Sequence, residues 1–262
     1  MTFLVICAFY FLLPFFWLIV SASKTSRDLI LTFGLWFAPH FSLFNNLRCV
    51  FIVNNSIFVQ WLLNTLIYAG IGSVVGTVIS SMAGYALAKY IFPGRTFIFS
   101  LVLGSVLVPT MTLALPLFLL MSSWNLTNTY WSVLLPSIVS PFGVYLSRIY
   151  AAASIPDELL EAARIDGAGE FRTLATIASR LMTPALVTVF LFQFVAIWNN
   201  YLLPLIMLSD ERLFPITVGL RTLGAPTLVL TGALISTFPL LIGCMILQRF
   251  WRNGLGTGSI KG

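Results

Sequence analysis

The sequence predicts an all-α membrane protein, a polytopic bundle of six transmembrane helices. Of the 262 residues, 59% are hydrophobic and only 8% are charged, whereas soluble domains carry about 25% charged residues. The apolar residues also form long continuous runs, which indicate helices rather than the alternating strands of a barrel. This composition excludes soluble enzymes, disordered tails and disulfide scaffolds.

Six apolar runs are each close to the roughly 20 residues that a helix needs to cross the hydrocarbon core of a bilayer. They lie at about 3–20, 66–87, 97–121, 131–150, 184–208 and 227–250, within one transmembrane domain over residues 1–262. The small residues Ser21, Ala22 and Ser23 after the first run would also suit a signal-peptide cleavage site. Against that alternative, the run exceeds the roughly 7 to 15 residues of a signal core and has no basic segment before it.

The positive charges are spread between the apolar runs and form no basic face, so nucleic acid is not an expected partner. Their distribution follows the rule that cytoplasmic loops retain Lys and Arg. If the N-terminus is cytoplasmic, nine of the 14 cations lie in cytoplasmic loops or adjoining span ends: Lys89, Arg95, Arg148, Arg164, Arg172, Arg180, Arg249, Arg252 and Lys261. We therefore expect both termini in the cytoplasm.

The second apolar run repeats small residues at helical spacing. Gly72, Gly76, Ser80 and Gly84 each follow the previous one by four positions and so share one helix face. Such a face lets another helix approach closely. The alternative is a surface that slides when the bundle changes conformation.

Several kinds of chemistry are missing from the chain. All eight acids lie outside the apolar runs, whereas proton-driven and many sodium-driven transporters keep a carboxylate within the bilayer. The single histidine, His40, and the three cysteines show no metal-ligand spacing, and no glycine-rich phosphate loop is present. We therefore expect no catalytic residue, no metal site and no cofactor in this chain.

The most informative segment is residues 154–183, between the fourth and fifth runs, which holds five of the eight acids. Ser154 and Asp157 predict a helix that starts near Ile155, with Ile155, Leu159 and Ala162 or Ala163 on one side. Gly167 suits the left-handed end of that helix, and a second helix is expected from Glu170. The two alanines beside Glu161 would let a partner surface come close; the alternative is a helix packed on its own bundle.

This segment resembles the EAA loop of binding-protein-dependent ABC importer permeases. The matching residues are Glu161, Ala162, Ala163, Gly167 and Ile177. The resemblance implies a cytoplasmic coupling helix seated on an ATPase subunit, with Asp166 beside the contact. Where the family usually has Leu and Pro after the Ile, this chain has Ser179 and Arg180, so the bend into the fifth span stays open.

The resemblance extends over most of the chain and points to the maltose-type carbohydrate permeases. It rests on four further segments: Gly84–Arg95, Leu115–Pro136, Trp198–Pro204 and Gly254–Gly262. It implies a plasma-membrane complex of two permease chains, ABC ATPase subunits that bind ATP and Mg, and an extracytoplasmic solute-binding protein. The permease chains would be in contact with membrane lipid. The second permease is expected to be a different chain.

Residues of the solute path are sought among polar and aromatic side chains inside the apolar runs. Trp198 can stack on a sugar ring, and the amides of Asn199 and Asn200 can bond hydroxyl groups. Gln193 and Tyr85 are weaker candidates of the same kind. Hydrogen bonds between helices would explain all of these residues as well.

Three other functions remain open from the sequence. An ATP-independent channel or secondary transporter would give segment 154–183 no role. A structural or assembly subunit would need partners but would not line a solute path. A membrane enzyme is disfavoured, because no nucleophile and base can be paired.

Overall fold

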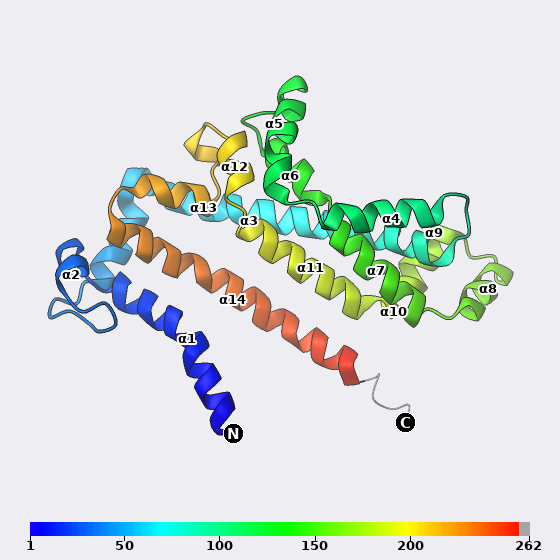
Figure 1. Ribbon diagram of the computed structural model, residues 1–262, viewed down its shortest axis with the longest axis horizontal. Coiled ribbons are helices and arrows are strands. Elements are labelled where there is room, and N and C mark those ends of the chain that lie inside the picture. Colours follow the sequence, from blue (N-terminus) through cyan, green and yellow to red (C-terminus); the bar gives the residue numbers. More distant parts are fainter. Residues whose placement is uncertain (257–262) are drawn as a thin grey trace. The chain divides into compact units, whose positions relative to one another are not determined.

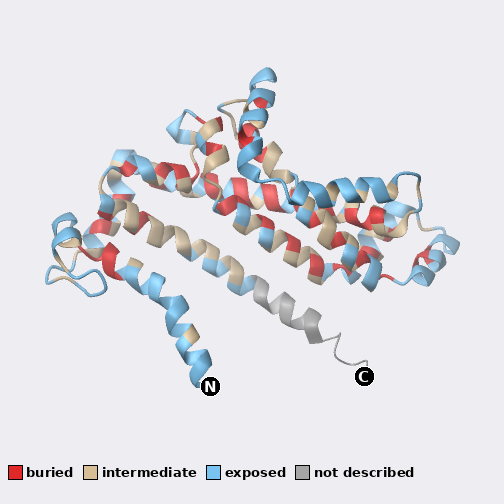
Figure 2. Ribbon diagram, viewed as in Figure 1, coloured by how far each residue is buried: buried red, intermediate tan, exposed pale blue. Residues whose placement is uncertain are grey.

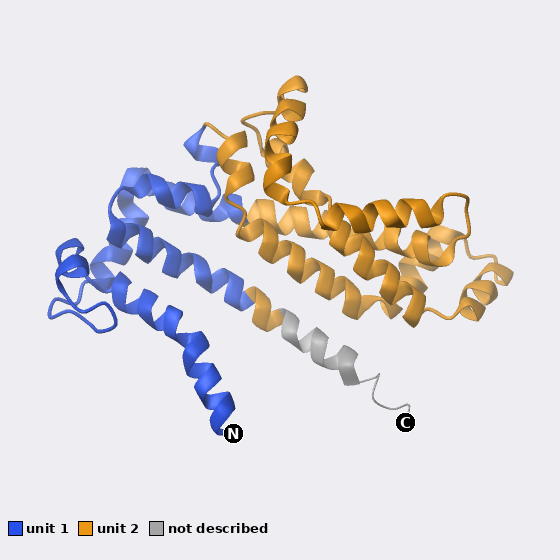
Figure 3. Ribbon diagram, viewed as in Figure 1, with its two compact units in different colours: residues 1–65, 210–242 blue, residues 66–209, 243–262 orange. Residues whose placement is uncertain are grey.

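The computed structural model describes residues 1–256, with side chains up to Ile246, and Figure 1 shows the order of its helices. The described residues form α-helices, short 3-10 and π turns and loops, with no strand among them. The chain divides into two compact units (Figure 3). The first contains residues 1–65 and 210–242, and the second contains residues 66–209 and the described part of the chain after position 242.

The first unit begins with α1 (Thr2–Ala22), an apolar helix whose side chains are almost all exposed (Figure 2). The short α2 (Ser26–Leu31) follows because Thr25 caps it, accepting a hydrogen bond from the Asp28 backbone N–H at 3.1 Å. The unit also holds the first part of α3 (Leu43–Lys89), η3 (Glu211–Leu213), α13 (Ile216–Gly219), η4 (Leu220–Leu223) and α14 (Pro226–Gly256) up to residue 242.

Helix α3 starts well before the expected span at 66–87 and contains a sharp kink. Three consecutive residues there, Asn54, Asn55 and Ser56, have φ values of 47°, 56° and 64°. This left-handed conformation costs most L-residues about 1 to 2 kcal/mol, and asparagine tolerates it better than most. The kink therefore separates a short amphipathic segment, residues 43–52, from the long apolar helix.

The core of the first unit ties the 210–216 loop to α3. Trp61 Nε1 donates to the Glu211 carbonyl at 2.8 Å, and Asn64 Nδ2 donates to the Arg212 carbonyl at 2.7 Å. The Thr65 hydroxyl accepts from the Ile216 N–H at 2.7 Å, which satisfies an otherwise unpaired donor at the start of α13. Gly219 lies directly against the Trp61 ring, where a larger residue would clash.

The second unit packs the long apolar part of α3 with the helices that follow it. They are α4 (Arg95–Val106), η1 (Thr110–Leu113), α5 (Ala114–Ser123), α6 (Tyr130–Ile138), α7 (Pro141–Ser154), α8 (Asp157–Ile165), α9 (Glu170–Thr173), the π-helix η2 (Leu174–Ala178), α10 (Ser179–Leu181), α11 (Thr183–Trp198) and α12 (Leu202–Met207).

The structure breaks three of the runs that were expected to be continuous helices. The run at 97–121 stops at Val106 and resumes at Thr110, with a bend of 100°, because Pro109 lacks an N–H and disfavours helix at the residue before it. The run at 184–208 ends at Trp198 and continues only as the short α12. The run at 131–150 is interrupted between Ile138 and Pro141. The expectation of unbroken helices is wrong in these three places.

Four helical segments of the described chain are long and apolar enough to cross a membrane: Thr2–Ala22, Leu43–Lys89, Tyr130–Ser154 and Pro226–Ile246. Two bent helix pairs bring the number to six if each pair forms one span: Arg95–Val106 with Thr110–Ser123, and Glu170–Leu181 with Thr183–Trp198. The protein is a helical membrane bundle, as its composition predicts.

Candidate functional site

The charged segment starts where α7 ends. Ser154 is the last residue of α7 rather than the cap of the next helix, and Ile155 and Pro156 are extended. Helix α8 therefore begins at Asp157, with Pro156 at its N-cap position. The predicted cap by Ser154 is wrong because proline restricts the preceding residue to extended conformations, which separates the two helices.

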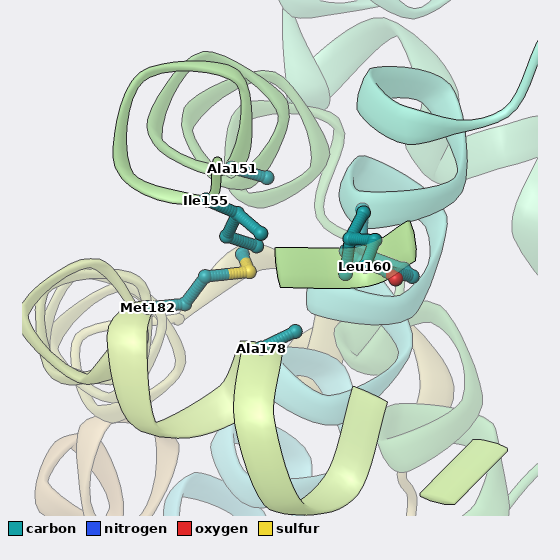
Figure 4. Close-up of a cluster of buried hydrophobic side chains, with 6 residues drawn as sticks. Ala151, Ile155, Leu160, Ala178 and Met182 are labelled. Carbon is teal, nitrogen blue, oxygen red and sulfur yellow. The ribbon is translucent and has the colours of Figure 1, made fainter. Parts of the chain in front are cut away.

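A cluster of buried apolar side chains holds α8 to its own bundle. Ile155 and Leu160 pack with Ala151 of α7, Ala178 of η2 and Met182 at the start of α11 (Figure 4), and Tyr85 of α3 completes the cluster. The buried side of α8 is thus formed by Leu160 and Ala163. Ala163, one of the two alanines expected on the apolar side, is buried together with Ile155, but Leu159 is exposed and Leu160 takes its place. The cluster joins α8 to four other elements of the second unit.

Polar contacts add to this anchor at the end of α3. Lys89 Nζ donates to the Ile155 carbonyl and to Asp157 Oδ1 at 2.7 Å, with the lysine side chain nearly buried. Arg95 Nε donates to the Leu87 carbonyl at 2.8 Å. Cations at a helix C-terminus are stabilised by the free carbonyls and the helix dipole. Arg95 therefore caps the end of α3, while Lys89 joins that end to α8.

Glu170 links α9 to α8 and to Tyr90, the residue that follows α3. Its carboxylate accepts a hydrogen bond from the Tyr90 hydroxyl at 2.5 Å and one from Arg164 Nε at 2.9 Å. The Tyr90 hydrogen bond first, and then the Arg164 guanidinium, hold the pKa of the Glu170 carboxyl below its usual range. Partial burial, and then the Glu170 hydrogen bond, raise the pKa of Tyr90, so the phenol stays a proton donor.

The turn between α8 and α9 is a Schellman motif. The Gly167 N–H bonds to the Arg164 carbonyl at 3.0 Å, and the Ala168 N–H bonds to the Ala163 carbonyl at 2.9 Å. Gly167 has φ of +74°, the left-handed conformation expected of it. Helix α9 then begins at Glu170, and Ile177 lies half-buried in the π-helical turn.

The bend into α11 exists without the Leu-Pro pair of the family pattern. The stretch Glu170–Leu181 and the helix Thr183–Trp198 meet at 83°. Ser179 and Arg180 lie in α10 just before the bend, and Pro184 takes the first turn of α11. A proline is tolerated there because first-turn N–H groups have no intrahelical partner.

The opposite face of this segment is exposed and carries both charge and apolar surface. Glu161 and Ala162 are exposed, and Glu161 forms no ion pair in the described chain. Ile165 is 86% exposed and Phe171 is 73% exposed. Asp166, the C-cap residue of α8, is exposed beside them. An anchored helix with an unpartnered mixed surface is suited to receive another protein.

Gln193 of α11 lies buried beside the break between α6 and α7. Its Nε2 donates to the Ser137 carbonyl at 2.9 Å and lies 3.3 Å from the Ile138 carbonyl. The Ser137 carbonyl needs an outside donor because Pro141, four residues on, has no N–H to give it. The Gln193 N–H groups thus pair backbone carbonyls that the break between α6 and α7 leaves without a helical donor. The Oε1 atom of the same amide is buried without a partner.

The small residues of α3 lie against neighbouring helices. A side chain at Gly76 would collide with the Gln193 amide, and one at Gly72 would come within 2.8 Å of Ile197 Cδ1. Ser80 is buried, and its hydroxyl donates to the Ser140 carbonyl at 3.4 Å. A Cβ at Gly84 would lie 2.5 Å from Ser147 Cβ. This face of α3 meets α11 at one end and α7 at the other.

The other candidates of the solute path occupy different environments. Trp198 is buried at the end of α11, 5.5 Å from the Phe194 ring. Asn199 is exposed, and its Nδ2 donates to the Val195 carbonyl at 2.8 Å, so it caps α11. Asn200 Oδ1 accepts from the Leu203 N–H at 3.4 Å at the start of α12. Tyr85 is buried in the apolar cluster around Ile155 and Leu160, which contains none of the other candidates.

Two residues of the anchor were not singled out from the sequence. Lys89 and Tyr90 lie inside the Gly84–Arg95 segment that resembles the family. That resemblance was the sequence feature that could have drawn attention to them. Their partners, Asp157 and Glu170, are more than 60 positions away, so local patterns could not reveal the pairing. Among the described residues, no group of three His, Cys, Asp or Glu side chains could hold a metal ion.

The fold defines the class of the protein: a polytopic helical membrane protein. The sequence model of the binding-protein-dependent transport system inner membrane component family matches residues 76–253, and the chain belongs to that family. The matched range includes α8, α9 and Gln193. The alternative of a channel or secondary transporter is thereby disfavoured.

Individual relatives match along almost the whole chain. The arabinooligosaccharides transport system permease protein AraQ of Bacillus subtilis is 35% identical, over 99% of this chain and 94% of the relative. The lactose transport system permease protein LacG of Rhizobium radiobacter is 30% identical, over 98% and 93%. The trehalose/maltose transport system permease protein MalG of Thermococcus litoralis is also 30% identical, over 98% and 93%.

The fold has a counterpart of known structure. A chain in the crystal structure of a bacterial ABC transporter involved in the import of the acidic polysaccharide alginate superposes with a TM-score of 0.81. The match covers 95% of this chain and 94% of that chain at 22% identity. At this identity, the likeness establishes a shared fold.

Proposed function

We propose that this chain is the permease subunit of an ABC importer for a carbohydrate, and that its α8–α9 segment receives the ATPase subunit. The observation that carries the proposal is the exposed face of α8, with Glu161, Ala162 and Ile165, on a helix whose other face is firmly anchored. The names of the relatives, which concern arabinooligosaccharides, lactose and trehalose or maltose, support the carbohydrate class.

The anchor explains how force on α8 would reach the membrane helices. Leu160 and Ile155 are packed between α7 and α11, and Lys89 ties Asp157 to the end of α3. A partner that moves α8 would therefore move these helices with it rather than bend a loose loop. ATP binding to the partner would favour one arrangement of the bundle through differential contacts with α8.

The remaining partners follow from the family. ATP and Mg would be bound and hydrolysed by the ATPase, so this chain would be non-catalytic. A second permease chain and an extracytoplasmic solute-binding protein would complete a complex in the plasma membrane, with both termini of this chain in the cytoplasm. The excess of Lys and Arg on the α8 side supports that orientation.

For the solute path we propose Trp198, Asn199 and Asn200, with Gln193 and Tyr85 as further candidates. The exposed amide of Asn199 and the unpartnered Oε1 of Gln193 could each bond a hydroxyl group. The test is solute uptake by the assembled complex with Asn199→Ala and Asn200→Ala. Unchanged rate and unchanged solute preference would remove both residues from the path.

The docking proposal is tested by charge reversal on α8. The chain would be co-expressed with its neighbouring genes, extracted in mild detergent, and the co-purifying ATPase identified by mass spectrometry. Glu161→Lys should reduce ATPase recovery and solute-stimulated ATP hydrolysis several-fold, because the charge contact proposed between Glu161 and the ATPase would become repulsive. The matched control is Glu211→Lys, an exposed acid in the first unit, which should leave recovery unchanged.

Two results would contradict the proposal. Full recovery and full stimulation with Glu161→Lys would show that this face of α8 is not the docking surface. Recovery of the unmodified chain alone, from membranes shown to contain the ATPase, would contradict the partnership itself. The solute class is tested separately by uptake of labelled oligosaccharides, sugar alcohols and amino acids; uptake of amino acids alone would exclude a carbohydrate importer.

A further inference from the structure

An exposed aromatic patch lies between α2 and the start of α3 in the first unit. It consists of Phe33, Leu35, Trp36, Phe37, Phe41 and Phe44, which we call the aromatic patch. Phe33 is 72% exposed, Trp36 is 66% exposed and Phe44 is 76% exposed. Clustered apolar rings on an exposed loop mark a surface that is covered by something other than water.

The patch continues the apolar surface of α1. The Phe37 ring lies 6.2 Å from the Phe16 ring of α1, and the contacts continue to Phe41 and Phe44 at 6.2 Å each. Phe16 lies six residues before Ala22, where α1 ends, which corresponds to about 9 Å along a helix axis. Interfacial apolar groups insert about 5 to 10 Å into the boundary between headgroups and acyl chains. With the end of α1 at the bilayer surface, Phe37 would lie within that range.

Hydrogen bonds hold the ends of the loop to the end of α1. Lys24 Nζ donates to the Phe33 carbonyl at 2.7 Å, and the Ser42 N–H donates to the Ser23 carbonyl at 2.7 Å. Asn46 Nδ2 donates to the Ala22 carbonyl at 2.8 Å and to the Lys24 carbonyl at 2.9 Å. Both ends of the loop are thus fixed, which keeps its rings beside α1.

The backbone of the loop limits how deep it can go. Residues 32–42 form no regular helix, and a non-helical backbone exposed to hydrocarbon would leave costly unpaired polar groups. The exposed cations Arg27 and Arg48 flank the loop in the sequence, while His40 Nδ1 lies 3.9 Å from Asp28 Oδ2, an acid that is largely shielded and bonded to Thr25. Exposed aromatic rings with flanking cations suit the acyl boundary and the phosphate groups of a lipid leaflet.

We propose that the aromatic patch is an interfacial anchor, inserted in the headgroup region of the leaflet at the C-terminal end of α1. It fixes the depth of α1 and of the short segment 43–52 at that surface. Trp36 and the Phe rings supply the apolar contact, and Arg27 and Arg48 supply positive charge for the lipid phosphates. The anchor is independent of which solute the permease carries and of how α8 is used.

The proposal is tested by lipid quenching of a fluorescent label. Full-length chain in which Cys7, Cys49 and Cys244 are replaced by Ser would carry Trp36→Cys labelled with a polarity-sensitive dye, in nanodiscs of phosphatidylcholine and phosphatidylglycerol. Lipids brominated near the headgroup should quench the label about twofold, as for an interfacial side chain. The matched control, a label at Glu211→Cys in the other loop of this unit, should show little quenching.

Two outcomes would overturn the proposal. Equal quenching at positions 36 and 211 would show that the patch does not enter lipid. Quenching at position 36 that disappears when the chain is co-purified with its partner subunits would show that a protein covers the patch. A second labelled variant, Phe44→Cys, carries the same expectation if the Trp36→Cys chain does not fold.

Discussion

The Gln193 amide offers the sharpest test of the packing in the second unit. Replacing Gln193 with Met keeps the side-chain length but removes the donor to the Ser137 carbonyl at 2.9 Å and to the Ile138 carbonyl at 3.3 Å. Each buried acceptor left without a donor costs about 1 to 3 kcal/mol. The amide has only two N–H groups, and the poorly placed Gly72 carbonyl at 3.4 Å adds little.

A compensating gain lowers the expected cost. Gln193 Oε1 is buried without a partner, and its removal with the amide recovers part of the desolvation penalty. The net loss for Gln193→Met should therefore be about 1 to 2 kcal/mol, at the lower end of the range for one unpaired carbonyl. Thermal unfolding of the purified chain in detergent should show a Tm lower by about 2 to 8 °C.

The control is the adjacent position on the exposed side of the same helix. Phe192 is 52% exposed, and Phe192→Met should leave the Tm within about 2 °C because exposed substitutions change stability little. Gly76 supplies the second arm, since any side chain there meets the Gln193 amide. Gly76→Ala should destabilise the chain alone but cost much less in a Gln193→Ala background.

The reasoning would be refuted by either of two results. An unchanged Tm for Gln193→Met would mean that the amide does not pair the carbonyls freed at Pro141. Additivity of Gly76→Ala and Gln193→Ala within about 0.5 kcal/mol would mean that the two residues do not touch.

Three further predictions concern the anchor and the small-residue face. Gly167→Ala should lower the free energy of unfolding by about 1 kcal/mol, because the backbone φ of +74° strains alanine even though its Cβ would meet no atom within 4 Å. The loss should appear as faster hydrogen exchange in α8, and unchanged exchange would contradict the prediction. Tyr90 and Arg164 lower the pKa of the Glu170 carboxyl. The contribution of these contacts to folding stability is therefore fully present above the ordinary carboxyl pKa and is lost as the pH falls through the lowered value. After correction for the pH dependence of the intrinsic exchange rate, protection of α9 should therefore fall at acid pH in the natural chain, while Glu170→Gln should lower protection at neutral pH and remove that pH dependence. Gly84→Ala should lower the stability of the chain, because its Cβ would lie 2.7 Å from the Arg148 backbone N. The control Gly70→Ala, on the same helix, meets nothing within 4 Å and should leave stability unchanged or raise it. Equal Tm changes for the two variants would refute this packing.

Composition and short sequence patterns predict the class of the protein and several of its local features. A charged fraction of 8% and long apolar runs are incompatible with a soluble core, and the structure confirms the helical membrane bundle. The α8–α9 turn was also readable, because a left-handed glycine followed by an acidic helix start depends on adjacent residues alone. The resemblance to the EAA loop was likewise carried by a short stretch of the sequence, residues 161–177.

The positions of the helix breaks and the buried side of α8 depend on contacts between distant parts of the chain. Pro109 and Pro141 were visible in the sequence, but whether a proline kinks, ends or merely begins a helix depends on which donor pairs the freed carbonyl. At Ser137 that donor is Gln193, 56 positions away. Likewise, Leu160 rather than Leu159 faces inward because Met182 and Ala178 pack against it. Such contacts depend on distant segments meeting in space, which periodicity along one segment does not encode.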